Sequence, residues 1–182
     1  MPIHTTHPLT GDTITASLAG AALVLSPRYG ESYSFDQAGR LLGLFVDERS
    51  YQRALDHRLL ERLRDNGQRR RELPPDESAA LLARAFAALR DLAAIAPRLD
   101  LPDAERAALA SALERVLAFG PERLQADGAA FARLYKPVSI LPPDQYLALV
   151  LQATEGCSWN RCTFCGLYRD RAFRLDVWER RR

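Results

Sequence analysis

The sequence has a small net charge and no long apolar run, and each shortage argues against a class of protein. Only Lys136 among the 25 basic residues is a lysine, and the net charge of +2 is too small to indicate a nucleic-acid partner. No apolar run approaches the roughly 20 residues of a membrane-spanning helix. The first residues lack the basic start and the apolar core of a signal peptide. We therefore expect a cytoplasmic protein with no membrane partner and no specific nucleic-acid signal.

Cysteine is also scarce, but its three copies lie close together. Cys157, Cys162 and Cys165 are all of the cysteines in the 182 residues, and they follow an apolar run at 146–151 that predicts a buried strand. Thiols in this arrangement indicate a metal or cluster site, because thiolates suit iron–sulfur clusters, zinc or Cu(I). A structural zinc site usually takes four protein ligands, and there is no fourth cysteine. Reduced thiols also fit the expected cytoplasmic location.

The spacing of the cysteines resembles a known cluster motif. Cys157-x4-Cys162-x2-Cys165, with Phe164 directly before the last cysteine, is similar to the C-x3-C-x-aromatic-C motif of the radical S-adenosylmethionine (radical SAM) superfamily. The chain has one extra residue between the first two cysteines, and its second half matches without departure. The resemblance implies that the three cysteines ligate three irons of a [4Fe–4S] cluster and that S-adenosylmethionine binds the fourth. It also implies that Phe164 lies near the adenine of that cofactor.

The resemblance further implies an activity and a fold. In the family, an electron from a reductant such as flavodoxin or ferredoxin cleaves S-adenosylmethionine to a 5′-deoxyadenosyl radical, and the substrate here is unknown. The cluster loop of the family follows the first strand of a partial (βα) barrel. Residues 145–182 would be the start of such a barrel, which needs several units of roughly 30 residues each. We therefore expect the N-terminal part of a radical SAM enzyme, truncated and inactive alone.

Other interpretations of the same cysteines stay open. Cys162 and Cys165 alone could form a thioredoxin-like redox dithiol, although this leaves Cys157 unexplained. A zinc site could combine the three thiolates with one of the three upstream histidines. The chain could also be a non-catalytic iron–sulfur or zinc module that docks on a partner. Buried cysteines are often plain core residues, but three in one polar loop argue against that.

Upstream of the cysteines, the sequence predicts a small β-hairpin. Residues 1–20 show no periodicity and predict a flexible arm. A short strand is expected at 21–25. Two strand-like runs, Tyr33–Phe35 and Arg40–Val46, are joined by Asp36–Gly39, which is typical of a type I turn followed by a left-handed glycine.

Four helices are expected to follow and to pack together as a bundle. The first is predicted at Ser50–Arg64, with Ser50 as N-cap and with Leu55, Leu59 and Leu63 as its buried stripe. The others are predicted at 77–95, 103–119 and 122–135. Residues 21–135 would form this hairpin-plus-helix domain, and the proline-rich residues 136–144 a linker. The predicted fold class is therefore α+β: a small N-terminal hairpin or sheet, a helical bundle, and the first strand and cluster loop of an incomplete (βα) barrel.

Overall fold

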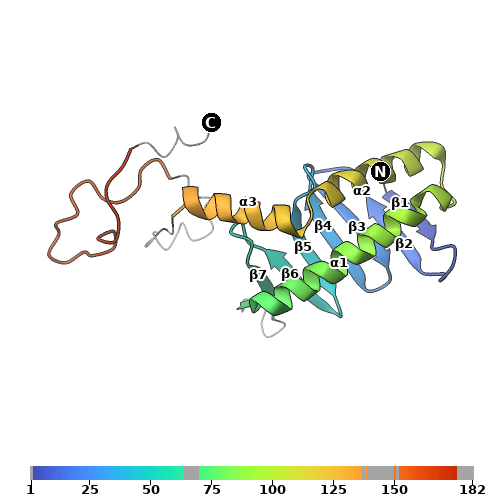
Figure 1. Cartoon of the computed structure of the whole chain (residues 1–182), viewed down its shortest axis with the longest axis horizontal. Coiled ribbons are helices and arrows are strands. Elements are labelled where there is room, and N and C mark those ends of the chain that lie inside the picture. The colour runs from blue at the N-terminus through green and yellow to red at the C-terminus, as the bar shows by residue number, and fades with distance from the viewer. Residues whose placement is uncertain (1, 64–69, 137, 139–149, 151, 176–182) are drawn as a thin grey trace. The chain divides into compact units, whose positions relative to one another are not determined.

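The computed structural model describes residues 2–63, 70–136, 138, 150 and 152–175. The chain divides into two compact units, Met1–Gly128 and Ala129–Arg182. In the described part of the first unit, eight strands form one antiparallel sheet in which each strand pairs with the next one along the chain (Figure 1).

The strands and helices have the following bounds. The strands are β1 Pro2–Thr6, β2 Thr13–Ser17, β3 Ala22–Arg28, β4 Glu31–Asp36, β5 Leu41–Val46, β6 Arg49–Arg53, β7 Leu59–Arg62 and β8 Arg70–Glu72. The helices are α1 Pro75–Ile95, a short 3-10 turn Ala96–Arg98, α2 Asp103–Ala118 and α3 Pro121–Leu134.

One face of the sheet is apolar and the other carries hydroxyl groups. Side chains alternate between the two faces of a strand, and the buried face receives large apolar residues such as Ile14, Leu25 and Tyr33. The opposite face carries residues such as Thr15 and Ser26, which are paired across β2 and β3 and only half-buried. This is the pattern of an antiparallel sheet that is covered on one side only.

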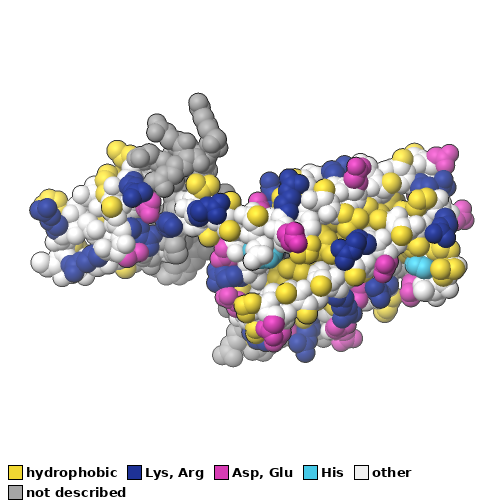
Figure 2. All heavy atoms as spheres, viewed as in Figure 1, with side chains coloured by type: hydrophobic (Ala, Val, Ile, Leu, Met, Phe, Trp, Pro, Cys, Tyr) yellow, Lys and Arg dark blue, Asp and Glu magenta, His cyan; other side chains and the backbone are white. Residues whose placement is uncertain are grey.

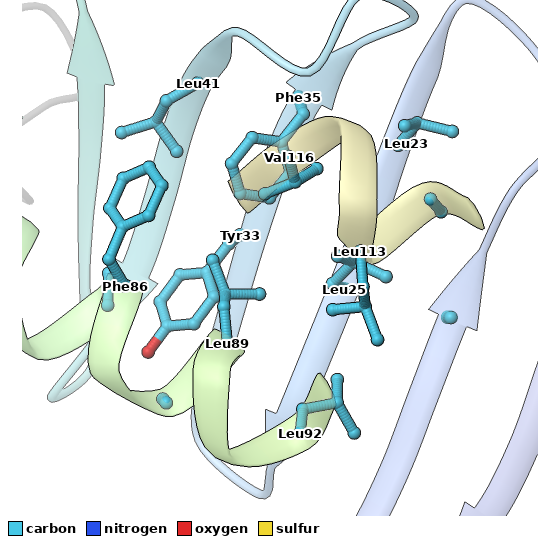
Figure 3. Packing of buried hydrophobic residues seen from close by; sticks show 14 of the residues in the cluster. Leu23, Leu25, Tyr33, Phe35, Leu41, Phe86, Leu89, Leu92, Leu113 and Val116 are labelled. Carbon is cyan, nitrogen blue, oxygen red and sulfur yellow. The ribbon is translucent and has the colours of Figure 1, made fainter. Parts of the chain in front are cut away.

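Helices α1 and α2 cover the apolar face. Phe86, Leu89 and Leu92 of α1 and Leu113 and Val116 of α2 face the side chains of the sheet (Figure 3). Because the helices bury their apolar stripes against the sheet, the core is a helix–sheet layer. The predicted arrangement of a small hairpin, a helical bundle and the first strand of a barrel is therefore wrong.

The predicted irregular structure of residues 1–20 is also wrong. This region forms β1 and β2, which pair in register from Pro2–Ser17 to Thr6–Thr13. Ile3 and Ile14 are fully buried, while the residues between them on the outer face are mostly polar. Threonine favours extended structure because it is β-branched, and four of the five threonines in residues 1–20 lie in β1 or β2.

The predicted helix Ser50–Arg64 is also wrong. The described part of this segment forms β6, a turn and β7. Leu55, expected in a buried stripe, is 61% exposed. The buried positions of these strands include Arg53 and Glu61, and Glu61 is paired with Arg49 and Arg71 at 3.3 and 2.9 Å. Charged residues on the buried face hid the alternation of a strand.

Other predicted elements are confirmed. Strands β4 and β5 form the predicted hairpin, in which Asp36 and Arg40 are joined by a backbone hydrogen bond and Gly39 has φ of 90°. Helices α1, α2 and α3 occupy the three predicted downstream ranges. The predicted strand at 146–151, apart from Val150, and most of the predicted linker at 136–144 lie outside the described residues.

Candidate metal centre

All three cysteines lie in one loop whose ends are joined. The backbone N–H groups of Glu155 and Arg174 each donate to the other residue's carbonyl oxygen at 2.9 Å, as in a hydrogen-bonded antiparallel pair. Residues 156–173 form the loop between them. Gly156, the first residue of the loop, has φ of 76°, and a Cβ there would lie 2.8 Å from the carbonyl oxygen of Ala172. A glycine at this position therefore lets the two ends of the loop approach each other.

The segment before the loop is held to the residues that follow α3. The hydroxyl of Tyr135 donates to the carbonyl oxygen of Val150 at 2.6 Å. The backbone N–H of Lys136 donates to Oε1 of Gln152 at 3.0 Å, and Nε2 of Gln152 donates back to the Lys136 carbonyl oxygen. The start of the cysteine loop is thus anchored by both backbone and side-chain groups.

The three thiols are free and half-buried. Sγ of Cys157 accepts the backbone N–H of Asn160 at 3.4 Å. This hydrogen bond, and a second from the backbone of Trp159, hold the pKa of the Cys157 thiol below its ordinary value. Cys157 therefore gains thiolate character, which is the form that binds metals.

The rest of the loop is tied to its own backbone. Nδ2 of Asn160, a residue with φ of 46°, donates to the carbonyl oxygen of Tyr168 at 3.1 Å. The guanidinium of Arg169 donates to the Cys162 carbonyl oxygen at 2.7 Å. The guanidinium carbon of Arg171 lies over the Tyr168 ring, 5.6 Å from the ring centroid. None of these contacts was predicted, because neither a hydrogen bond to a carbonyl oxygen nor a cation–π contact leaves a motif in the sequence.

The three thiols are chemically suitable ligands for an iron–sulfur cluster, although they do not lie close enough together to hold a metal ion in this structure. Across the described ranges, no three Cys, His, Asp or Glu side chains are placed as a ready metal-ligand group. The loop nevertheless supplies three thiolates, which is the ligand type of such clusters. It contains no helix or strand that would resist their approach. We infer that the residues fit the cluster if the loop rearranges between its joined ends.

The histidines fit a zinc site less well. Nδ1 of His7 accepts the backbone N–H groups of Leu9 and Thr10. Nδ1 of His57 accepts the Nε–H of Arg53 at 3.2 Å. One ring nitrogen of His7 and one of His57 are therefore already used by hydrogen bonds within the first unit.

Large apolar side chains of the cysteine segment are exposed. Phe164, which the radical SAM resemblance places near an adenine, is 91% exposed, and Trp159 and Leu175 are each 67% exposed. No described residue after Gly128 is buried. The described part of the second unit therefore presents the thiols and the exposed rings of Trp159 and Phe164 without a buried apolar residue.

No protein-family model, curated protein or solved structure matches the chain. None of the helices in the described ranges has the length and apolar character needed to cross a membrane. The residues of the cysteine loop are therefore the features of the chain that point to a function.

Proposed function

We propose that Cys157, Cys162 and Cys165 bind a [4Fe–4S] cluster and that its remaining iron binds S-adenosylmethionine. The observation that carries the proposal is the loop itself: every cysteine of the chain lies between the joined residues Glu155 and Arg174. The radical SAM resemblance gives this ligand set its specific interpretation. The reductant would be of the flavodoxin or ferredoxin type, and the substrate is unknown.

The physical state of the second unit supports ligation. Small units without a sufficient core commonly depend on a metal or on disulfides for stability. Ligand binding to the native state adds its free energy to folding, as in small metal-dependent domains. A cluster held by the three thiolates would thus supply the stability that the described residues of this unit do not gain from burial.

The chain's own residues would have separate parts in such a site. A bound cluster with its cofactor supplies reductive cleavage of the sulfonium and a 5′-deoxyadenosyl radical. The three cysteines hold the irons, and the hydrogen bonds to Cys157 favour its thiolate. Phe164 offers an exposed ring to the adenine.

Anaerobic reconstitution of the full chain with iron and sulfide tests the proposal. We expect about four irons per chain, a brown protein, and a spectrum of the reduced cluster that changes when S-adenosylmethionine is added. Replacing any one of the three cysteines by alanine should lower the iron content sharply. Thr163→Ala is the matched control, because it changes the same loop without removing a thiol.

Each other result has a definite meaning. Colourless protein, or iron content unchanged in all three cysteine variants, would overturn the proposal. One tightly bound zinc per chain would favour the zinc module. Reversible oxidation of Cys162 and Cys165 in metal-free protein would favour the redox dithiol. If a cluster forms but its spectrum does not change when S-adenosylmethionine is added, the result would favour a non-catalytic iron–sulfur module.

A further inference from the structure

A groove in the first unit has the size and lining of a small-molecule site. It lies between the N-terminal parts of α1 and α3 and the turn that joins β6 to β7, where Figure 2 shows hydrophobic side chains at the surface. Its volume is about 410 Å³, within the range of ligand pockets. Its apolar wall consists of Leu73, Pro75, Ala79, Leu82, Ala83 and Pro121.

The turn in this groove contains an unusual histidine. In the β6–β7 turn, the N–H of Ala54 donates to the carbonyl oxygen of Arg58 and that of His57 to Ala54. The β4–β5 turn has the same two hydrogen bonds, and there the left-handed position is Gly39. In the β6–β7 turn that position is His57, with φ of 77°. A side chain in this conformation costs roughly 1–2 kcal/mol compared with glycine.

Helix α3 accommodates His57 through a second unfavourable residue. Gly128 lies inside α3, where glycine is about 1 kcal/mol less favourable than alanine. A Cβ on Gly128 would lie 2.5 Å from Cβ of His57. Glycine is unfavourable inside a helix, and histidine is unfavourable at a left-handed turn position. Here these two residues lie against each other. Strained residues of this kind cluster at functional sites.

The imidazole of His57 is held in one tautomer. Arg53, whose side chain is 4% exposed, donates its Nε–H to Nδ1 of His57 and another N–H to the carbonyl oxygen of Leu124. Because a guanidinium only donates, Nδ1 must be the acceptor, and the proton of the neutral ring lies on Nε2. Burial and the charge of Arg53 lower the pKa of His57. His57 lines the groove, and at neutral pH its ring is therefore neutral with Nε2–H as its donor.

The charges around the groove disfavour ionic ligands. Arg58 is held by Asp56 at 2.7 Å and by Glu72 at 2.9 Å. With Glu122, the described lining carries three carboxylates and one guanidinium, a formal charge of −2, which disfavours anions. The starts of α1 and α3 each contribute about half a positive charge, which offsets about half of this negative charge and weakens the attraction for a cation. A neutral ligand is therefore compatible with the lining.

We propose that this groove binds a neutral, mostly apolar small molecule through a carbonyl or similar acceptor that receives a hydrogen bond from His57. The apolar body would pack on Ala79, Leu82 and Pro121. Every lining residue of the groove belongs to the first unit, so this ligand would be distinct from the proposed cluster.

Nile red, a neutral fluorescent molecule with a carbonyl group, is a suitable probe for the full chain. We expect saturable one-site binding with a blue shift of its emission. Ala79→Trp fills the groove and should weaken binding at least tenfold. The neighbouring Ala80→Trp is the matched control, because both alanines are exposed in α1 but only Ala79 lines the groove.

His57→Gly tests the hydrogen bond and gives the turn the residue found in the matching β4–β5 turn. Loss of one hydrogen bond should weaken Nile red binding about fivefold. Binding of N-phenyl-1-naphthylamine, which lacks a carbonyl, should change little. Equal losses for both probes would overturn the role of His57.

Three further results would overturn the site as a whole. They are non-saturable Nile red binding, equal binding by Ala79→Trp and Ala80→Trp, and tighter binding of the anion 1-anilinonaphthalene-8-sulfonate than of Nile red. Self-association that is abolished by Ala79→Trp would instead assign the groove to a second copy of the chain.

Discussion

The two units of the chain differ in what holds them together. The buried apolar residues of the first unit extend from Ile3 to Leu124 and form one cluster between the sheet and its helices. In the described part of the second unit, no residue is buried, and hydrogen bonds fix the ends of the cysteine loop. The first unit is therefore stabilised by burial, whereas the described residues of the second unit have no buried core, which is compatible with the proposed cluster.

The largest contrast is expected from the same substitution made in each unit. Phe35 is fully buried, so Phe35→Ala should destabilise the protein by about 3–5 kcal/mol through lost burial and a cavity. Phe164 is 91% exposed, so Phe164→Ala should change the stability by no more than about 0.5 kcal/mol. Urea unfolding followed by circular dichroism measures both. A large loss for Phe164→Ala would show that the second unit has a core after all.

Two glycines with positive φ sharpen the comparison. In the first unit, a Cβ on Gly39 would overlap the carbonyl group of Arg115, so Gly39→Ala should cost about 2–4 kcal/mol in unfolding experiments. Gly30→Ala is its control, because Gly30 has φ of 79° but open space around it, and about 1–2 kcal/mol is expected.

In the second unit, Gly156→Ala should disturb the closure of the loop at Ala172. We expect reduced iron retention after reconstitution and an unchanged urea midpoint for the first unit. If the urea midpoint of the first unit shifts while iron retention stays normal, Gly156 is not required for closure of the cysteine loop.

Mild acid should weaken the first unit through His57. Burial, and then the charge of Arg53, lower the pKa of His57, with Asp127 and Asp56 acting in the opposite direction. The unfolded chain therefore takes up this proton at higher pH than the folded chain. The contribution of neutral His57 to the free energy of unfolding is complete above about pH 6.5, and it is lost as the pH falls through the pKa of His57 in the folded state. Unfolding free energies from pH 8 to 5 should decline less steeply for His57→Gly than for the native chain.

The smallest effect concerns the reactivity of Cys157 in metal-free protein. Its pKa is lowered by the backbone N–H groups of Asn160 and Trp159. In a Cys162→Ser, Cys165→Ser double variant, iodoacetamide should therefore alkylate Cys157 at a lower pH than it alkylates free cysteine. Mass spectrometry gives the labelling rate at each pH. A profile identical to that of free cysteine would show that these hydrogen bonds do not form in solution.

Local signals predicted part of the fold. The spacing of Leu82, Phe86 and Leu89 predicted α1, and the Asp36–Gly39 turn predicted the β4–β5 hairpin. The β6–β7 hairpin was missed because His57 occupies the position where a glycine would have marked the turn. The placement of the helices on the sheet was also missed, because an apolar stripe does not specify whether a helix or a sheet covers it.

The cysteines of the candidate centre were evident from the sequence, but the closure of their loop was not. Glu155 and Arg174 meet through backbone groups alone, and every residue except proline carries the same backbone donor and acceptor. Gly156 is a residue whose lack of a side chain this closure requires. Cluster binding, the cofactor and the role of Phe164 stay predictions.

The strand order of the first unit has a consequence for how the protein is made. Every pairing joins neighbours along the chain, and contacts between near neighbours form quickly because they close short loops. Synthesis releases the N-terminal residues first. The sheet can therefore assemble hairpin by hairpin on the ribosome, so that Cys157, Cys162 and Cys165 emerge already attached to a folded body.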